Sequence, residues 1–239
     1  MEWYEELDFD EDPFSVDPRE NHEHLVAMEE VLDEVFYRIQ AGSMLVVEGP
    51  EGSGKTSVLM AAAKKYGGKK NVVYVDCEKL DKDLNITHVL QDKYGLMGRL
   101  FNKKPKDMTV LLDNVHKLSN KNTERIKFYF DQNYIRSIIF TTTDYKKAKF
   151  SDSLKDRIGL RVMKTPELSE YDAVEIIRNR IGDIELFNEP LIKKMFEMSN
   201  GSPNKLLLIA RNAAIEATKK SRTRAQMSDL KIVQEVKNE

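Results

Sequence analysis

The feature that most constrains the fold of this chain is a glycine-rich segment, Gly49–Thr56, which reads GPEGSGKT and satisfies the pattern G-x-x-x-x-G-K-[ST]. The segment follows a short apolar run, MLVVE, and precedes a stretch with helical periodicity, TSVLMAAAKK. Gly49, Gly52 and Gly54 allow the backbone to turn sharply and to point its N–H groups inward, at the positive end of the helix. A strand, an anion-binding loop and a helix in this order predict an α/β fold built around a phosphate site.

The side chains of the loop suit a nucleoside triphosphate with magnesium. Lys55 is expected to reach the β and γ phosphates, and the Thr56 hydroxyl is expected to ligate Mg²⁺, a hard cation that prefers oxygen. The alternative interpretation, a turn that merely caps a helix, is disfavoured because the strand, the spacing, the lysine and the threonine all match. The predicted ligands are therefore ATP or ADP with Mg²⁺, bound by Gly49, Pro50, Glu51, Gly52, Ser53, Gly54, Lys55 and Thr56.

The first two thirds of the chain alternate short β-rich runs with longer helical ones, a rhythm typical of an α/β fold. Helices are expected on both faces of a parallel sheet, because its crossovers are right-handed. The predicted helices are His24–Ala41, Thr56–Tyr66, Thr87–Leu100 and Asn122–Asn133. The five predicted strands, apolar runs with few charges, are Met44–Glu48, Val72–Cys77, Thr109–Asp113, Ser137–Thr142 and Leu160–Lys164.

After the fifth predicted strand the β signal stops, and helical segments follow at Ser169–Ile181, Pro190–Asn200, Pro203–Lys220 and Ser228–Val236. The prediction is therefore a five-stranded parallel sheet sandwiched by helices, followed by a small all-helical lid domain. No winged helix or other DNA-reading domain is expected. The expected boundaries are an acidic N-terminal segment at 1–20, an α/β core at 21–166, a helical lid at 167–220 and a C-terminal tail at 221–239.

The third predicted strand, TVLLDN, ends in a carboxylate that suits a magnesium site. Asp113 is expected to hold the ion through water. Many P-loop enzymes that hydrolyse their nucleotide place a glutamate next, whereas this chain has Asn114, an amide that cannot accept a proton. His116 is a second candidate base, although a lone histidine at the start of a loop is more often a polar surface residue. The sequence thus predicts slow turnover or a binding switch.

With GPEGSGKT, LLDN, IIFTTTD, SLKDRIGLRV and NGSPNKLLLIARNAA in this order, the chain resembles the AAA+ ATPases over roughly Phe14–Thr218. It is most similar to the clade of origin-recognition initiators and of general-secretion and transposition ATPases, because of its lead-in DPFSVDPRENHEHLVAMEEVL. The resemblance implies that Thr142 or Thr143 lies between Asp113 and the γ phosphate. It also implies an adenine pocket lined by Pro13, Phe14 and Val16, although the aromatic ring could equally anchor a core.

The same resemblance implies that the site is completed across a subunit boundary. Arg157 in LKDRIG matches the arginine that reaches the γ phosphate of a neighbouring subunit, a role that suits a planar, permanently charged side chain. A homo-oligomer or a partner protein is therefore expected on the Arg157 face. The alternative is a surface arginine paired with Asp152 or Asp156.

The lid departs from the family pattern. Similar proteins carry Gly-x-Pro-Arg at the start of the last lid helix, where this chain reads Gly201-Ser202-Pro203-Asn204-Lys205. Asn204 lacks the charge of the arginine, and Lys205 points about 100° away on a helix. Both stay candidate nucleotide contacts. Together with Asn114, they favour a nucleotide-dependent conformational switch over a fast motor.

Composition bears on location and partners. The formal net charge of −2 gives no global drive toward nucleic acid, so DNA contact would have to come from lysine-rich loops such as Phe101–Lys106 or Lys219–Arg224. A single cysteine, Cys77, fits a reducing compartment and the core, and no apolar run is long enough to cross a bilayer. A cytoplasmic protein is expected. The acidic, aromatic first residues are interpreted as a disordered tail or, as the alternative, a docking peptide for a basic partner.

Two functional hypotheses follow. The first is an AAA+ ATPase or ATP-gated switch that assembles with itself or a partner in DNA replication, recombination or a related remodelling step. The second is a non-hydrolysing adaptor that holds its nucleotide permanently and docks a partner protein.

Overall fold

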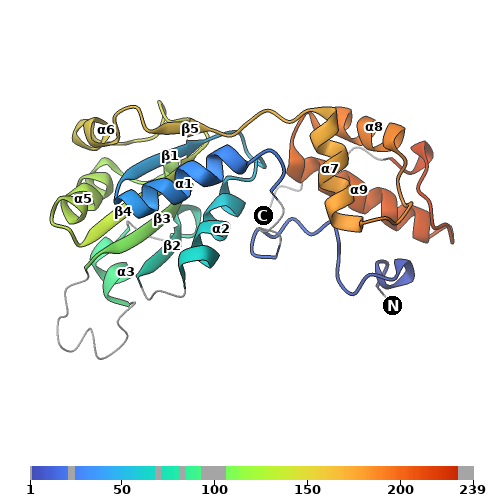
Figure 1. Ribbon diagram of the computed structural model, residues 1–239, viewed down its shortest axis with the longest axis horizontal. Coiled ribbons are helices and arrows are strands. Elements are labelled where there is room, and N and C mark those ends of the chain that lie inside the picture. The colour runs from blue at the N-terminus through green and yellow to red at the C-terminus, as the bar shows by residue number, and fades with distance from the viewer. Residues whose placement is uncertain (1, 21–24, 68–70, 81–83, 93–105, 231–239) are drawn as a thin grey trace. The chain divides into compact units, whose positions relative to one another are not determined.

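The computed structural model describes residues 2–20, 25–67, 71–80, 84–92 and 106–230 (Figure 1). The chain divides into two compact units. The first, called the helical unit, comprises Met1–Ala27, Glu51–Gly54 and Pro166–Glu239. The second, called the α/β unit, comprises Met28–Pro50 and Lys55–Thr165. None of the helices in the described ranges combines the length and apolar character that crossing a membrane requires.

The α/β unit is built on a five-stranded sheet in the order β2-β3-β4-β1-β5, with every neighbouring pair parallel. The parallel sheet predicted from sequence is thereby confirmed. Except for Arg136, all residues of β3 and β4 are buried, which explains why these two strands carry few charged residues. The strands are β1 (Met44–Glu48), β2 (Val72–Asp76), β3 (Met108–Asp113), β4 (Ile135–Thr142) and β5 (Val162–Lys164).

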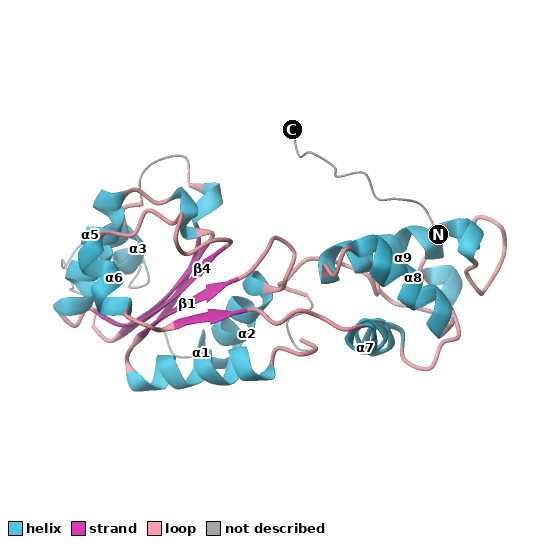
Figure 2. Ribbon diagram, turned by 90° about the horizontal axis from the view of Figure 1, so that it is seen from above, coloured by secondary structure: helices cyan, strands magenta, loops and turns pink. Residues whose placement is uncertain are grey.

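Helices cover both faces of this sheet, as Figure 2 shows. On one face lie α1 (Glu29–Ala41) and α2 (Lys55–Gly67). On the other lie α3 (Ile86–Asp92), α5 (Asn120–Asp131) and α6 (Asp152–Ile158). Serine side chains define two of these starts, since Ser119 accepts a hydrogen bond from the Asn122 N–H and Ser151 accepts one from the Leu154 N–H.

Several predicted boundaries differ from the structure. The first helix begins at Glu29, later than predicted. The fifth strand begins at Val162, two residues later than predicted, because the residues before it form the turn that ends α6, in which the Arg161 N–H donates a hydrogen bond to the Ile158 carbonyl. The short helix α6 precedes the fifth strand and contains Arg157 near its end. Of the stretch predicted as Thr87–Leu100, the described part is helical to Asp92, and the remainder lies outside the described residues.

The helical unit contains α7 (Glu170–Ile181), α8 (Glu189–Ser199) and α9 (Pro203–Thr218) around their own core. A capping box of Ser169 with Asp172 starts α7. Asn200, in the left-handed conformation, ends α8. Of the predicted C-terminal helix, residues 231–236 lie outside the described part, and Met227–Asp229 form a 3-10 turn.

The N-terminal segment packs into the helical unit instead of forming a disordered tail. Phe14 is fully buried, stacked on Trp3 at 6.2 Å between ring centroids and in contact with Phe187 at 5.6 Å. Leu7 joins the same core, and Asp12 forms an ion pair of 2.6 Å with Arg211 of α9. The apolar residues scattered among the carboxylates are core residues, which is why the acidic composition alone misled the prediction.

Candidate nucleotide-binding site

The glycine-rich loop connects β1 to α2, as predicted. Its backbone takes positive φ at Gly52 (72°) and Gly54 (90°), a conformation that residues with a side chain adopt less readily. Lys55, the first residue of α2, is buried, and its Nζ donates hydrogen bonds of 2.7 Å to the carbonyl oxygens of Gly49 and Pro50. The loop is therefore folded around the ammonium group of its own lysine.

One polar atom of the loop is left without a protein partner. The Ser53 hydroxyl is buried, and within the described residues it makes no hydrogen bond. A buried hydroxyl without a partner costs stability unless another group satisfies it. A phosphate oxygen would do so, and the residues present therefore fit a bound nucleotide.

The predicted magnesium residues meet at the carboxyl end of β3. The Thr56 hydroxyl, in the first turn of α2, donates a hydrogen bond of 2.8 Å to Asp113 Oδ2, and Asp113 itself is almost completely buried. Tyr74 of β2 donates a second hydrogen bond of 2.9 Å to the same oxygen. Burial and the negative charge of Asp113 raise the pKa of Tyr74, so the phenol stays protonated and remains a donor.

The threonine in contact with Asp113 is Thr141, whereas the position of Thr142 or Thr143 between Asp113 and the γ phosphate stays a prediction. Thr141 donates a hydrogen bond to Asp113 Oδ1, whereas the Thr142 side chain contacts the backbone of Asp144 and Thr143 is exposed. The reason is the register of the sheet: Leu112 pairs with Phe140, so that the next residues along, Asp113 and Thr141, lie side by side. Alternation along the strand then turns the following threonine to the opposite face.

Asn114 lies beside a carboxylate that sequence reasoning missed. Asn114 takes a left-handed conformation (φ 55°), and its backbone N–H donates a hydrogen bond of 3.0 Å to the Thr141 hydroxyl. Its Nδ2 lies 3.3 Å from Asp76 Oδ1. Asp76 ends β2 and pairs in register with Asp113. Only strand pairing reveals this neighbour, because nothing in the linear pattern around Asp76 marks it as part of the site.

The structure places His116, the alternative base, beside Glu78. Its Nε2 lies 3.4 Å from Glu78, and its Nδ1 is buried without a hydrogen-bond partner in the described structure.

The neighbouring Cys77 is a buried core residue, as expected, and burial together with the charge of Asp113 raises the pKa of its thiol to about 12. The thiol is therefore unreactive at neutral pH.

Arg157, the predicted arginine finger, forms an ion pair inside its own subunit. Its Nε donates 3.0 Å to Asp131 at the end of α5, and neither Asp152 nor Asp156 is the partner. The guanidinium also lies 5.7 Å from the Phe130 ring centroid. A hydrogen bond from Lys127 and then that from Arg157 hold the pKa of Asp131 below its usual value. The Arg157 side chain is still half exposed.

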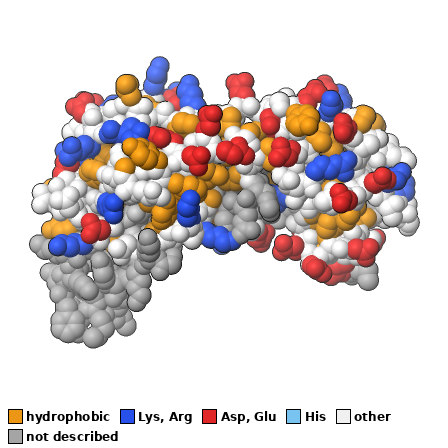
Figure 3. Space-filling view, viewed as in Figure 1, with side chains coloured by type: hydrophobic (Ala, Val, Ile, Leu, Met, Phe, Trp, Pro, Cys, Tyr) orange, Lys and Arg blue, Asp and Glu red, His pale blue; other side chains and the backbone are white. Residues whose placement is uncertain are grey.

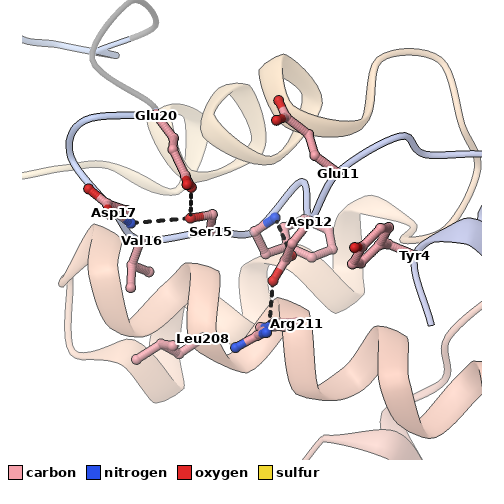
Figure 4. A pocket seen from close by; sticks show the side chains of 10 residues that line it. Tyr4, Glu11, Asp12, Ser15, Val16, Asp17, Glu20, Leu208 and Arg211 are labelled. Carbon is pink, nitrogen blue, oxygen red and sulfur yellow. Dashed lines mark hydrogen bonds and ion pairs between the residues drawn. The ribbon is translucent and has the colours of Figure 1, made fainter. Parts of the chain in front are cut away.

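The residues predicted to line the adenine pocket have different surroundings. Phe14 is a core anchor of the helical unit, whereas Val16 is partly exposed and lines a cavity of about 370 Å³ between the N-terminal segment and α9 (Figure 4). Asn204 and Lys205 occupy the first turn of α9, where the Ser202 side chain accepts from the Lys205 N–H. Contact of Val16, Asn204 and Lys205 with nucleotide stays a prediction.

Comparison with known proteins identifies a protein family whose model covers the phosphate loop and Asp113. A family model described as "AAA domain" matches residues 41–172, more than half of the chain. No curated protein matches the sequence significantly.

Solved structures share the fold at low sequence identity. Cdc6p from Pyrobaculum aerophilum superimposes with a TM-score of 0.73 at 14% identity, over 92% of this chain and 69% of that one. The Aeropyrum pernix Orc1 protein in complex with DNA superimposes with a TM-score of 0.70 at 15% identity, over 86% of this chain and 64% of that one. The RuvB Holliday junction branch migration motor of Thermotoga maritima superimposes with a TM-score of 0.62 at 17% identity, over 85% of this chain and 67% of that one. This chain thus spans about two thirds of each.

These three likenesses establish the fold, since the identities are too low to transfer an activity. The family match covers both the phosphate loop and Asp113, the two parts of the site that the structure brings together. The chain therefore belongs to the AAA domain family of P-loop ATPases.

Proposed function

We propose that this protein binds ATP with Mg²⁺ and acts as a slow ATPase or an ATP-gated switch. The observation that carries the proposal is the 2.8 Å contact between Thr56 and Asp113, two residues 57 positions apart in the chain. A hydroxyl and a carboxylate that meet beside a phosphate loop are the oxygen ligands a magnesium nucleotide needs.

The loop supports each part of this assignment. Its N–H groups and the Ser53 hydroxyl would receive the phosphates, and the Lys55 ammonium would neutralise the β and γ phosphates. Thr56 and Asp113 would hold Mg²⁺, Asp113 through water, and the ion would offset charge on the phosphate oxygens. Because Asn114 cannot take a proton, turnover is expected to be slow.

Nucleotide binding is the first test. Titration of the protein with a fluorescent ATP analogue should show saturable binding that strengthens with Mg²⁺. Lys55→Ala should weaken it at least tenfold, and Lys121→Ala, which removes an exposed lysine of α5, should leave it unchanged. A wild-type protein that neither retains nor takes up adenine nucleotide would refute the proposal.

We further propose that the protein assembles with itself or with a partner through the face that carries Arg157. Two features of the α/β unit support this: the half-exposed guanidinium, and the fully exposed side chain of Leu160, three residues further on. Particle size should increase when ATP and Mg²⁺ are added, and Arg157→Ala should weaken that increase. A particle size that does not change with nucleotide would contradict assembly.

The proposed setting is cytoplasmic DNA replication, recombination or a related remodelling step, in line with one fold relative that was solved in complex with DNA and another that is described as a Holliday junction branch migration motor. DNA contact through Lys219–Arg224 has limited support, because the cations there are engaged: Lys220 and Arg222 pair with Asp229 at 2.6 Å. On the face seen in Figure 3, acidic and basic side chains are interspersed. Most of the loop Phe101–Lys106 lies outside the described residues.

A salt series tests DNA contact directly. Binding that weakens steeply with salt would demonstrate phosphate neutralisation. If no binding occurs at low salt, the nucleic-acid role falls, and the nucleotide site is unaffected.

A second candidate function is a nucleotide-bound adaptor that does not hydrolyse ATP. The amide at position 114 favours it, because no carboxylate follows Asp113. A phosphate-release assay separates the candidates, since an adaptor shows MgATP binding without release. Gain of turnover in Asn114→Glu, absent from the wild type, would support the adaptor.

A further inference from the structure

Asp76 and Asp113 bring two carboxylates to the same edge of the sheet. They end adjacent parallel strands, β2 and β3, and pair with each other in register. Neighbouring strands lie about 4.8 Å apart, so the two residues are close neighbours at the edge where α2 contributes Thr56. The Asp76 side chain is only 15% exposed. It therefore lies largely within the protein beside the candidate magnesium position.

The two carboxylates have different partners, which indicates different tasks. Asp113 accepts hydrogen bonds from Thr56, Tyr74 and Thr141, so both of its oxygens are already engaged by the site. In the described residues none of these three donors forms a hydrogen bond with Asp76, whose Oδ1 lies 3.3 Å from Asn114 Nδ2. Lys79 also pairs with Asp76, but its side chain is 84% exposed, so water screens that contact.

An ionised carboxylate accepts hydrogen bonds and donates none, and this determines how the Asn114 amide lies. The amide must present its Nδ2 to Asp76, and its Oδ1, on the other branch of the same plane, then faces away from Asp76. The backbone is held as well, because the Asn114 N–H donates to Thr141, the residue that also contacts Asp113. The carbonyl oxygen is thus the part of the amide that remains able to accept a hydrogen bond from a water molecule.

We propose that Asn114 Oδ1 orients the water that attacks ATP, and that Asp76 is the positioning residue that holds the amide in this orientation. The inference rests on the proposed ATPase function and deepens it. An amide can direct a water without taking its proton, as a glutamine does in some P-loop enzymes.

The reaction balances without a protein base. The water oxygen bonds to the γ phosphorus while the bond from that phosphorus to the β–γ bridging oxygen breaks, and the electron pair leaves with ADP. The water proton passes to a phosphate oxygen. In this scheme no residue assists the proton transfer, so hydrolysis directed by Asp76 and Asn114 is expected to be slow but not absent.

Asp76 also has a structural task, and the test must separate the two. Its Oδ1 accepts from the Glu78 N–H at 3.1 Å and so caps the 3-10 helix Cys77–Lys79. Asparagine caps a helix about as well as aspartate. Asp76→Asn therefore keeps the cap, but it removes the acceptor-only character, because an amide can present either nitrogen or oxygen to Asn114.

The experiment is a double-mutant cycle on phosphate release, with kcat, KM and MgATP affinity measured for each protein. Asp76→Asn and Asn114→Ala should each lower kcat about tenfold to a hundredfold, with KM and affinity unchanged. Adding Asp76→Asn to Asn114→Ala should have no further effect, because Asp76 acts only through the amide. Glu78→Gln, which removes a charge at the same edge without touching Asn114, should match the wild type.

Each other outcome is informative. If Asp76→Asn releases phosphate at the wild-type rate, the inference is overturned and the ATPase proposal stands. The same holds if the Asp76 effect persists in the Asn114→Ala background or appears in MgATP affinity, since either result assigns Asp76 a structural role. If the wild type binds MgATP and releases no phosphate, both the hydrolysis proposal and this inference fail, whereas nucleotide binding survives.

Discussion

The Thr56 hydroxyl donates a 2.8 Å hydrogen bond to Asp113, joining the first turn of α2 to the end of β3. This one contact couples the phosphate loop to the acidic strand, so the two side chains proposed to hold Mg²⁺, Asp113 through water, lie at the same place. Preorganised ligands reduce the conformational cost of binding.

Thr56→Val tests the metal role. The variant keeps the shape of the side chain but removes the oxygen, so MgATP affinity should fall about tenfold or more while affinity for metal-free nucleotide is retained. Titrations with Mg²⁺ and with a chelator measure both. An equal loss under both conditions would show that Thr56 acts on folding of the loop and not on the ion.

Thr141→Val tests the threonine that the structure selects. Removing the hydroxyl takes a donor from buried Asp113 and an acceptor from the Asn114 N–H, which should cost about 1–3 kcal/mol of unfolding free energy. Urea denaturation measures the loss. Thr143→Val is the matched control at an exposed position of the same run and should change stability by less than about 0.5 kcal/mol.

Phe14→Ala tests whether the N-terminal segment belongs to the helical core. Its ring is fully buried against Trp3 and Phe187, so truncation should lower the unfolding free energy by about 3–5 kcal/mol. Val16→Ala, at a partly exposed position two residues on, should cost far less. A small effect of Phe14→Ala on stability together with a large loss of nucleotide affinity would instead support the predicted adenine contact.

Asp229 should make stability depend on pH. Burial would raise its pKa, but the hydrogen bonds from Arg222 and Lys220 outweigh burial and hold the pKa well below the ordinary value of about 4. Its contribution is therefore fully present above about pH 4 and is lost as the pH falls toward the folded-state pKa. Asp229→Asn should cost about 2–3 kcal/mol at neutral pH and flatten the acid limb of a stability–pH curve.

Arg157 can be tested by mixing two inactive proteins. Arg157→Ala should leave MgATP affinity unchanged and cost under about 1 kcal/mol of stability, because its pair with Asp131 is partly exposed. Lys55→Ala is expected to bind nucleotide weakly but keeps the arginine. If the arginine acts in trans, mixing the two should restore part of the phosphate release. No recovery in mixed particles of confirmed assembly would argue against this role.

Much of the nucleotide site could be predicted because its determinants are local. The loop depends on glycine, lysine and threonine at fixed spacing, and the strands are recognisable as apolar runs, so both can be read from consecutive residues. Asp113 could be found in the same way, since it directly ends such a run. The resemblance of the ordered motifs to AAA+ ATPases agrees with the family match over residues 41–172.

The sequence by itself therefore determined the phosphate loop, the parallel sheet and the helices of the helical unit, all of which follow from short-range patterns. Tertiary structure alone decided that Thr141 contacts Asp113, that Asp76 holds Asn114, that Asp131 pairs with Arg157, and that Phe14 joins the helical core. The physical reason is that these contacts depend on strand register and on packing between distant segments. A shift of one residue in register would turn every side chain of a strand to the opposite face of the sheet. No local pattern specifies which residue of a distant segment each side chain contacts.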